Sequence, residues 1–185
     1  AAVTGGQNNG IGDNALYNVT SGAYNVALGG QALYSNTTAS GITAVGYQAG
    51  YSNTSGTNGV FIGYRAGYTS TGTGFVAVGS DAGLTKSSSD TFASVFVGTA
   101  AGTSVSTGID NTYVGGYAGR YATTGSANTA VGSAAFGTNT TPSTGSGNTA
   151  IGAWWSGVIA SPLHSNTSGD SNVAIAPGAL GLNTT

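Results

Sequence analysis

Residues 43–51 read Thr-Ala-Val-Gly-Tyr-Gln-Ala-Gly-Tyr, and versions of this sequence return along the whole chain. The glycine in the fourth place marks each copy and serves as its anchor. The anchors are Gly12, Gly29, Gly46, Gly63, Gly79, Gly98, Gly115, Gly132 and Gly152, and Ala176 takes this place in a tenth copy. Successive anchors lie 17, 17, 17, 16, 19, 17, 17, 20 and 24 residues apart. A period of this kind predicts a solenoid, in which each repeat buries its apolar side by stacking on its neighbours.

Two apolar positions flank one smaller position just before each anchor. The residue three before the anchor is β-branched in most copies, and the residue one before it is aliphatic, as with Val60 and Ile62 before Gly63. Residues two apart on a strand share one face, so we expect these two positions to form the core. Seventeen residues also leave room for a second short extended segment and two turns. The chain is therefore predicted to be all-β, a parallel β-solenoid of about ten 17-residue coils.

The residue between the two apolar positions is predicted to point away from the core. It is alanine in most copies, which lets another backbone approach closely. One coil supplies few apolar side chains, and at about 25 cal/mol per Å² their burial gains little against the entropy of ordering the backbone. We therefore expect a homotrimer in which sister chains supply the missing burial. The residues expected to face the sister chains are Ala44, Phe61, Phe96, Tyr113 and Ala130.

The composition argues against several classes of function. The chain has 185 residues, a net charge of −2 and only 3 Lys and Arg residues, so it offers no basic surface for nucleic acid or anionic lipid. No apolar run approaches the roughly 18 residues of a membrane helix. A single histidine and the absence of cysteine and glutamate argue against metal sites, catalytic triads and paired carboxylates. We expect one domain over residues 1–185 that is not an enzyme, binds no cofactor or metal, and does not insert into a membrane.

Four tyrosines form the first candidate contact surface. Tyr17, Tyr34, Tyr51 and Tyr68 each follow their anchor by five residues and are expected to stack as a ladder along one edge. Such a stripe of aromatic rings could bind sugar rings or a polymer surface. In-register parallel stacking favours the same arrangement without any ligand, so both interpretations stay open.

The second candidate contact lies in the two longest coils, at 133–151 and 153–175. The latter carries Trp154, Trp155 and His164, the least repetitive residues of the chain. Insertions in solenoids form loops on one face, which is often the binding face, and tryptophan is enriched at energetic hot spots. The tryptophans could therefore anchor a ligand, or they could simply close the end of the roll. His164 could equally be an ordinary loop residue.

The repeated motifs resemble those of a known group of fibrous proteins. Residues 128–132 read Asn-Thr-Ala-Val-Gly and residues 148–152 read Asn-Thr-Ala-Ile-Gly, which resemble the head repeats of trimeric autotransporter adhesins. The longer unit from Thr43 to Ser55 resembles repeats of bacteriophage tail fibres and of bacterial trimeric surface fibres. The resemblance covers essentially the whole chain, although the period here is longer than in the adhesin heads. It implies a left-handed parallel β-roll in which three chains run side by side and project from a cell or virion.

These observations together predict a non-enzymatic segment of an extracellular, cell-surface or tail fibre. As a homotrimer it would present a region that binds a cell-surface glycan or protein receptor. The alternative is a structural subunit of an extracellular filament assembled end to end, because partial repeats stand at both ends of the sequence. A third possibility is an ice- or crystal-surface binder that uses threonine ladders, but the uneven repeat lengths count against a match to a lattice.

Overall fold

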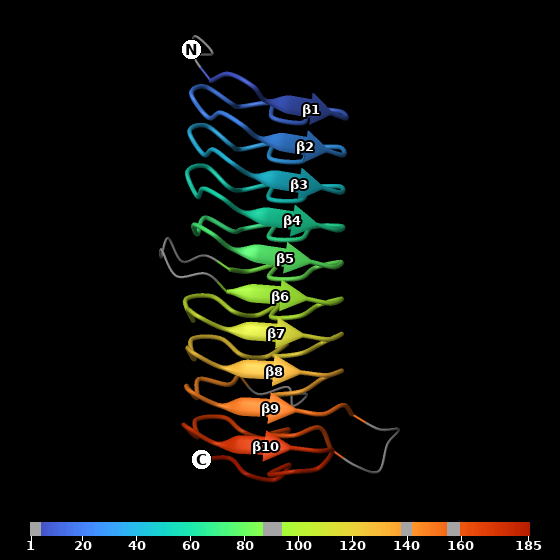
Figure 1. Ribbon diagram of the computed structural model, residues 1–185, viewed down its shortest axis with the longest axis vertical. Coiled ribbons are helices and arrows are strands. Elements are labelled where there is room, and N and C mark those ends of the chain that lie inside the picture. Colours follow the sequence, from blue (N-terminus) through green and yellow to red (C-terminus); the bar gives the residue numbers. More distant parts are fainter. Residues whose placement is uncertain (1–4, 87–93, 138–141, 155–159) are drawn as a thin grey trace.

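One parallel sheet runs the length of the molecule. The computed structural model describes residues 5–86, 94–137, 142–154 and 160–185, and these contain ten three-residue strands and no helix. The strands are β1 (Asn9–Ile11), β2 (Val26–Leu28), β3 (Thr43–Val45), β4 (Val60–Ile62), β5 (Val76–Val78), β6 (Val95–Val97), β7 (Thr112–Val114), β8 (Thr129–Val131), β9 (Thr149–Ile151) and β10 (Val173–Ile175). They pair in sequence order, each with the next, and Figure 1 shows them stacked in a single column. The predicted all-β parallel solenoid is confirmed.

The register follows the repeat. Val26 pairs with Thr43, Ala27 with Ala44 and Leu28 with Val45, so equivalent positions of neighbouring repeats lie directly beside one another. Each strand ends at an anchor, which turns the chain away from the sheet. Below, the β2 repeat means strand β2 and the residues up to the next strand, and the other repeats are named in the same way.

The segment after each anchor forms a second wall, but it is not the extended segment that the sequence predicted. In the β2 repeat, Gln31 has a φ of 58° and Leu33 a φ of 52°, which is the left-handed region. Ala32, between them, is not in this region, so left-handed residues alternate with others and successive N–H groups point in different directions. Ala32 donates within its own repeat to the carbonyl of Gly29 at 3.2 Å, whereas Leu33 donates to the carbonyl of Ala49 in the next repeat at 3.0 Å. This wall is therefore a stack of turns that still hydrogen-bonds from repeat to repeat.

The core lies on the opposite face of the strands from the one expected. The middle residue of each strand from β2 to β10 is buried, and Ala44, Phe61, Phe96, Tyr113 and Ala130 have no exposed surface within the single chain. The prediction that these five residues face sister chains is therefore wrong. The two walls of the roll lie so close together that an alanine often fills the space, and the larger aliphatic residues on either side point outward.

Large and small residues alternate across the roll. Where the middle strand residue is Phe96, the residue four after the anchor is Gly102, whose added Cβ would lie 2.7 Å from the Phe96 ring. Where the middle residue is Ala27, the same place holds Leu33, and both are buried. The interior of these two repeats is thus filled from one wall or from the other, which keeps the packing dense. In the β3 repeat both places are small, Ala44 and Gly50, and the Phe61 ring of the next repeat lies 2.7 Å from where a Cβ at Gly50 would be.

The aromatic residues of the interior form a continuous column through the middle of the solenoid. The Phe75 ring meets Phe96 edge-on at 5.2 Å between centroids, and Phe96 stacks on Tyr113 at 5.1 Å with an interplanar angle of 9°. Phe61 and Phe136 extend the column at its two ends, at 5.9 Å and 6.2 Å from their neighbours. Both geometries are favourable for aromatic pairs.

Asparagines just before the strands form a buried polar ladder. The side-chain oxygen of Asn111 accepts a hydrogen bond from the backbone N–H of Asn128 at 2.9 Å. Asn128 in turn accepts from Asn148, and Asn148 accepts from Asn172, both at 2.9 Å. Each buried amide is therefore satisfied only when the neighbouring repeat stands in register, which explains why asparagine precedes so many strands.

Tyr113→Phe should stabilise the chain by about 1–2 kcal/mol. Tyr113 is fully buried, and its hydroxyl has no partner at hydrogen-bonding geometry. Burial raises the pKa of Tyr113 well above its ordinary value, although the nearby Asn128 amide lowers the pKa and opposes part of the rise that burial causes. The folded chain therefore keeps the neutral phenol, and wild-type stability should fall as the pH rises above about 10, where the unfolded phenol ionises.

Urea unfolding at several pH values tests this prediction. The advantage of Tyr113→Phe over wild type should grow above about pH 10, because the variant lacks the ionising group. Phe96→Tyr is the matched control, since it adds a hydroxyl to the same stack and should destabilise. A Tyr113→Phe variant that is less stable than wild type would show that the hydroxyl is satisfied.

Candidate functional site

The predicted tyrosine ladder is present. The Tyr17 and Tyr34 rings stack at 5.2 Å with an interplanar angle of 2°, and the next two pairs, ending at Tyr68, lie at 5.1 Å and 5.0 Å. Tyr17 is exposed and the other three are half-buried. The in-register stacking of repeats accounts for this geometry, and binding by the ladder stays a prediction.

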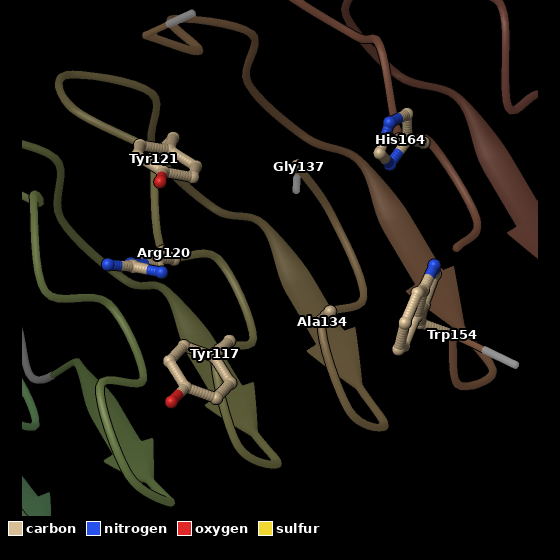
Figure 2. A pocket seen from close by; sticks show the side chains of 7 residues that line it. All are labelled: Tyr117, Arg120, Tyr121, Ala134, Gly137, Trp154 and His164. Carbon is tan, nitrogen blue, oxygen red and sulfur yellow. The ribbon is translucent and has the colours of Figure 1, made fainter. Parts of the chain in front are cut away.

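A pocket of about 370 Å³ lies further along the same wall. It is lined by Tyr117, Arg120, Tyr121, Ala134, Gly137, Trp154 and His164. These residues come from three successive repeats, those of β7, β8 and β9, and Figure 2 shows them arranged around the hollow. Its volume falls within the range of about 300–1,000 Å³ typical of small-molecule sites.

The pocket is hollow because the middle repeat contributes small residues. Tyr117, Ala134 and Trp154 each follow their anchor by two residues, so they belong to one column of equivalent positions. Successive repeats lie about 4.8 Å apart, so Ala134 leaves the two aromatic residues separated by a slot of about 10 Å. Gly137 widens the slot, since nothing lies within 4 Å of where its Cβ would be.

Arg120 adds a positive charge to the β7 end of the pocket. Figure 2 shows its guanidinium between the rings of Tyr117 and Tyr121, on the side away from Ala134 and Trp154. Its guanidinium carbon lies 5.1 Å from the centroid of the Tyr117 ring and 5.2 Å from that of Tyr121, so cation–π contacts with both rings hold it. Arg120 makes no ion pair with any described residue. Arg65, by contrast, donates from its Nε to the Asp81 carboxylate at 2.9 Å. The charge of Arg120 is thus oriented but not neutralised by a carboxylate.

The long insertion of the β9 repeat brings His164 to the pocket. After the insertion, the backbone N–H of Leu163 donates to the carbonyl of Ala179 at 3.1 Å, as that of Leu33 does to Ala49. The chain has therefore regained its register, and His164 occupies the position that Tyr34 has in the ladder. Trp154 precedes the insertion, and its backbone N–H donates to the carbonyl of Ser133 at 3.0 Å. Trp155 lies outside the described residues.

Sequence reasoning identified two of the seven lining residues. Trp154 and His164 stood out because they are rare in this chain, and the structure brings them to one pocket. Tyr117, Arg120 and Tyr121 were missed because they look like ordinary members of a repeat. Comparing each column of equivalent positions along the chain would have found them, because the side chains change abruptly in size and charge at these repeats.

The outer face of the sheet exposes a long aliphatic stripe. The third residue of every strand is aliphatic and projects outward, and none of the ten is buried in the single chain. Leu28 is 45% exposed and Ile62 is 39% exposed. The first strand residues add further Val and Thr side chains, and neither position carries a charged residue in any strand. The stripe is about 43 Å long, from nine spacings of about 4.8 Å.

The described residues hold few groups suited to metal chemistry. No three His, Cys, Asp or Glu side chains among them lie close enough to hold a metal ion together. None of the described segments forms a helix with the length and apolar character needed to cross a membrane. The candidate contacts in this part of the chain are therefore the pocket, the ladder and the outer stripe.

No protein-family model, curated protein or solved structure matches the chain. The resemblance to adhesin-head and tail-fibre repeats accordingly stays a prediction from the sequence motifs. A functional proposal must depend on the fold, the outer stripe and the pocket.

Proposed function

We propose that this chain is a non-enzymatic segment of an extracellular fibre, on a cell surface or a phage tail, that associates as a homotrimer and presents a surface-binding region. The solenoid supports this proposal because it is long, repetitive and built from short strands. The motifs of the sequence resemble those of trimeric fibres. Three copies of a weak site on one rigid rod would bind a surface with useful avidity.

The observation that carries the proposal is the aliphatic stripe on the outer face of the sheet. Threonine would suit the third strand position equally well for strand formation, yet all ten repeats place Ile, Leu or Val there. None of these side chains is buried by its own chain. Soluble monomers rarely expose a continuous apolar patch of more than a few hundred Å², so another surface is expected to cover this one.

Further copies of the same chain are the occupants that fit this stripe. The stripe carries no charge, so identical chains do not repel one another across it. Parallel copies also share the same spacing between repeats, so the ridges of one can match the grooves of another along the whole length. Three chains around one axis would bury the stripe of each and supply the burial that a thin roll lacks.

The mass of the assembly in solution tests the proposal. Light scattering coupled to size exclusion should give three chains for the wild type and one chain for a variant carrying Leu28→Asp and Val131→Asp. Both substitutions place a charge where the trimer would bury it without a partner, which is strongly unfavourable. Circular dichroism should show that the separated chain retains its strands.

Tyr24→Asp is the matched control. Tyr24 is 64% exposed with a φ of 59°, and Asp110 occupies the same repeat position with a φ of 56°. The backbone therefore accepts aspartate there, and the mass should remain that of three chains. A monomeric wild type, or a trimer unaffected by the stripe variant, would contradict the proposal. Long polydisperse polymers would support the end-to-end filament instead.

A further inference from the structure

We propose that the pocket between the β7, β8 and β9 repeats binds an anionic saccharide, a sugar that carries a carboxylate or sulfate group. The inference rests on the proposed function, because it names the ligand class of the fibre's contact region. The pocket lies within a single chain, so its occupation does not require association. The outer stripe uses positions before the anchors, whereas the pocket uses positions after them.

The shape and lining of the pocket suit a sugar ring. Tyr117 and Trp154 stand on either side of the slot left by Ala134 (Figure 2). The C–H faces of a pyranose are apolar while its edges carry hydroxyls, so a ring can pack against aromatic side chains and keep its edge in water. The volume of about 370 Å³ is at the small end for ligand sites, which suits a short saccharide or the terminal sugar of a chain.

The polar groups of the lining favour a ligand with a negative charge. Arg120 carries five N–H donors and no acceptor, and the indole of Trp154 is also only a donor. No lining side chain has a carboxylate or amide oxygen, the usual acceptors for the hydroxyls of a neutral sugar. Arginine matches the two oxygens of a carboxylate or sulfate with a planar pair of donors. Because two tyrosine rings already orient Arg120, little order remains to be imposed on binding.

The small number of positive charges on the chain favours a ligand that carries a single anionic group. The whole chain has 3 Lys and Arg residues and a net charge of −2, so a polyanion would meet no extended basic surface. One arginine at the end of an aromatic pocket instead suits one charged substituent on a ring. A saccharide is also the kind of ligand that a fibre meets on a cell surface.

Binding can be measured with a matched pair of sugars. Methyl β-D-glucuronide and methyl β-D-glucoside differ only at C6, which is a carboxylate in the first and a hydroxymethyl group in the second. Glucose 6-sulfate carries a sulfate ester at C6 and tests whether a sulfate can take the place of the carboxylate. Calorimetric titration of the full chain should give a weak dissociation constant for the glucuronide, on the order of 1 mM, and binding of the glucoside at least about tenfold weaker. A preference for the sulfate over the glucuronide would assign the charge to sulfated sugars within the same proposal.

Variants separate the contributions of the charge and of the cavity. Arg120→Gln should remove the preference for the charged sugar, whereas Arg65→Gln, which lies outside the pocket, should not. Ala134→Tyr should fill the slot and abolish binding with the fold intact. The backbone accepts that change, since Tyr117 has a φ of 61° in the same column and Ala134 a φ of 57°.

The outcomes distinguish this inference from the proposed fibre. A trimer that binds none of the three sugars, or that binds glucoside and glucuronide equally, would overturn the pocket assignment and leave the fibre proposal standing. A monomer that binds glucuronide through Arg120 would support the pocket and contradict the trimer. If benzoate binds as tightly as the glucuronide, the site recognises an aromatic acid and not a sugar, and the inference is also overturned.

Discussion

Gly115→Ala should lower the free energy of unfolding by about 3 kcal/mol or more, whereas Gly116→Ala should change it by less than about 0.5 kcal/mol. Gly115 is the anchor of the β7 repeat and has a φ of 134°, a conformation that essentially only glycine adopts. An added Cβ would also lie 2.5 Å from the carbonyl oxygen of Gly132, the anchor of the next repeat. Because that atom belongs to the backbone, it cannot rotate away.

Gly116 is a control in the same turn. Nothing lies within 4 Å of where its Cβ would be, and its φ is outside the left-handed region. Serine and threonine occupy the same place in other repeats, at Ser80 and Thr99. Urea unfolding at a fixed chain concentration is the measurement, since association would shift the midpoint with concentration. Equal shifts in the two variants would show that the close contact of successive anchors does not limit how the repeats stack.

The sequence predicted the register and the strands because these follow from the repeat itself. Equivalent residues of a parallel stack must lie side by side, so the spacing of the anchors alone places Ala27 beside Ala44. Which face of the strand is buried depends instead on the distance between the two walls. That distance is short, so alanine fits inside and valine points outward, the reverse of an ordinary strand with its larger side chains in the core.

A sequence signal for the correct face was present. Repeats with Phe61, Phe96 or Tyr113 in the middle of the strand have glycine four residues after the anchor, and the β2 repeat pairs Ala27 with Leu33. Such compensation in volume indicates that the two positions meet in one interior. The pocket was harder to predict, because it depends on differences between repeats and on where the long insertion of the β9 repeat returns to register.

Phe96→Ala should lower the free energy of unfolding by about 3–5 kcal/mol. The Phe96 ring is completely buried, and it contacts Phe75 and Tyr113 in the interior column at 5.2 Å and 5.1 Å between centroids. Its removal leaves a cavity that the two hydrogen-bonded walls cannot close, because both are fixed in register by their neighbours. Urea unfolding at a fixed chain concentration gives the loss.

Gly102→Leu alone should also destabilise, by about 1–3 kcal/mol, because the interior is already full. An added Cβ at Gly102 lies 2.7 Å from the Phe96 ring. The backbone itself accepts leucine, since Gly102 has a φ of 58° and Leu33, at the same place in the β2 repeat, has a φ of 52°. The expected cost therefore combines overpacking with the strain of a side chain in the left-handed region, and only the overpacking depends on the Phe96 ring.

The double variant Phe96→Ala with Gly102→Leu should be more stable than the sum of the two changes predicts, by about 1–3 kcal/mol. It converts the β6 repeat to the arrangement of the β2 repeat, where Ala27 and Leu33 fill the interior from the opposite wall. Unfolding of all four proteins completes a double-mutant cycle. Strictly additive losses would contradict the interpretation that the two walls share one volume. Coupling of the expected size would show that the interior volume of the β6 repeat must be filled, and that either wall can supply it.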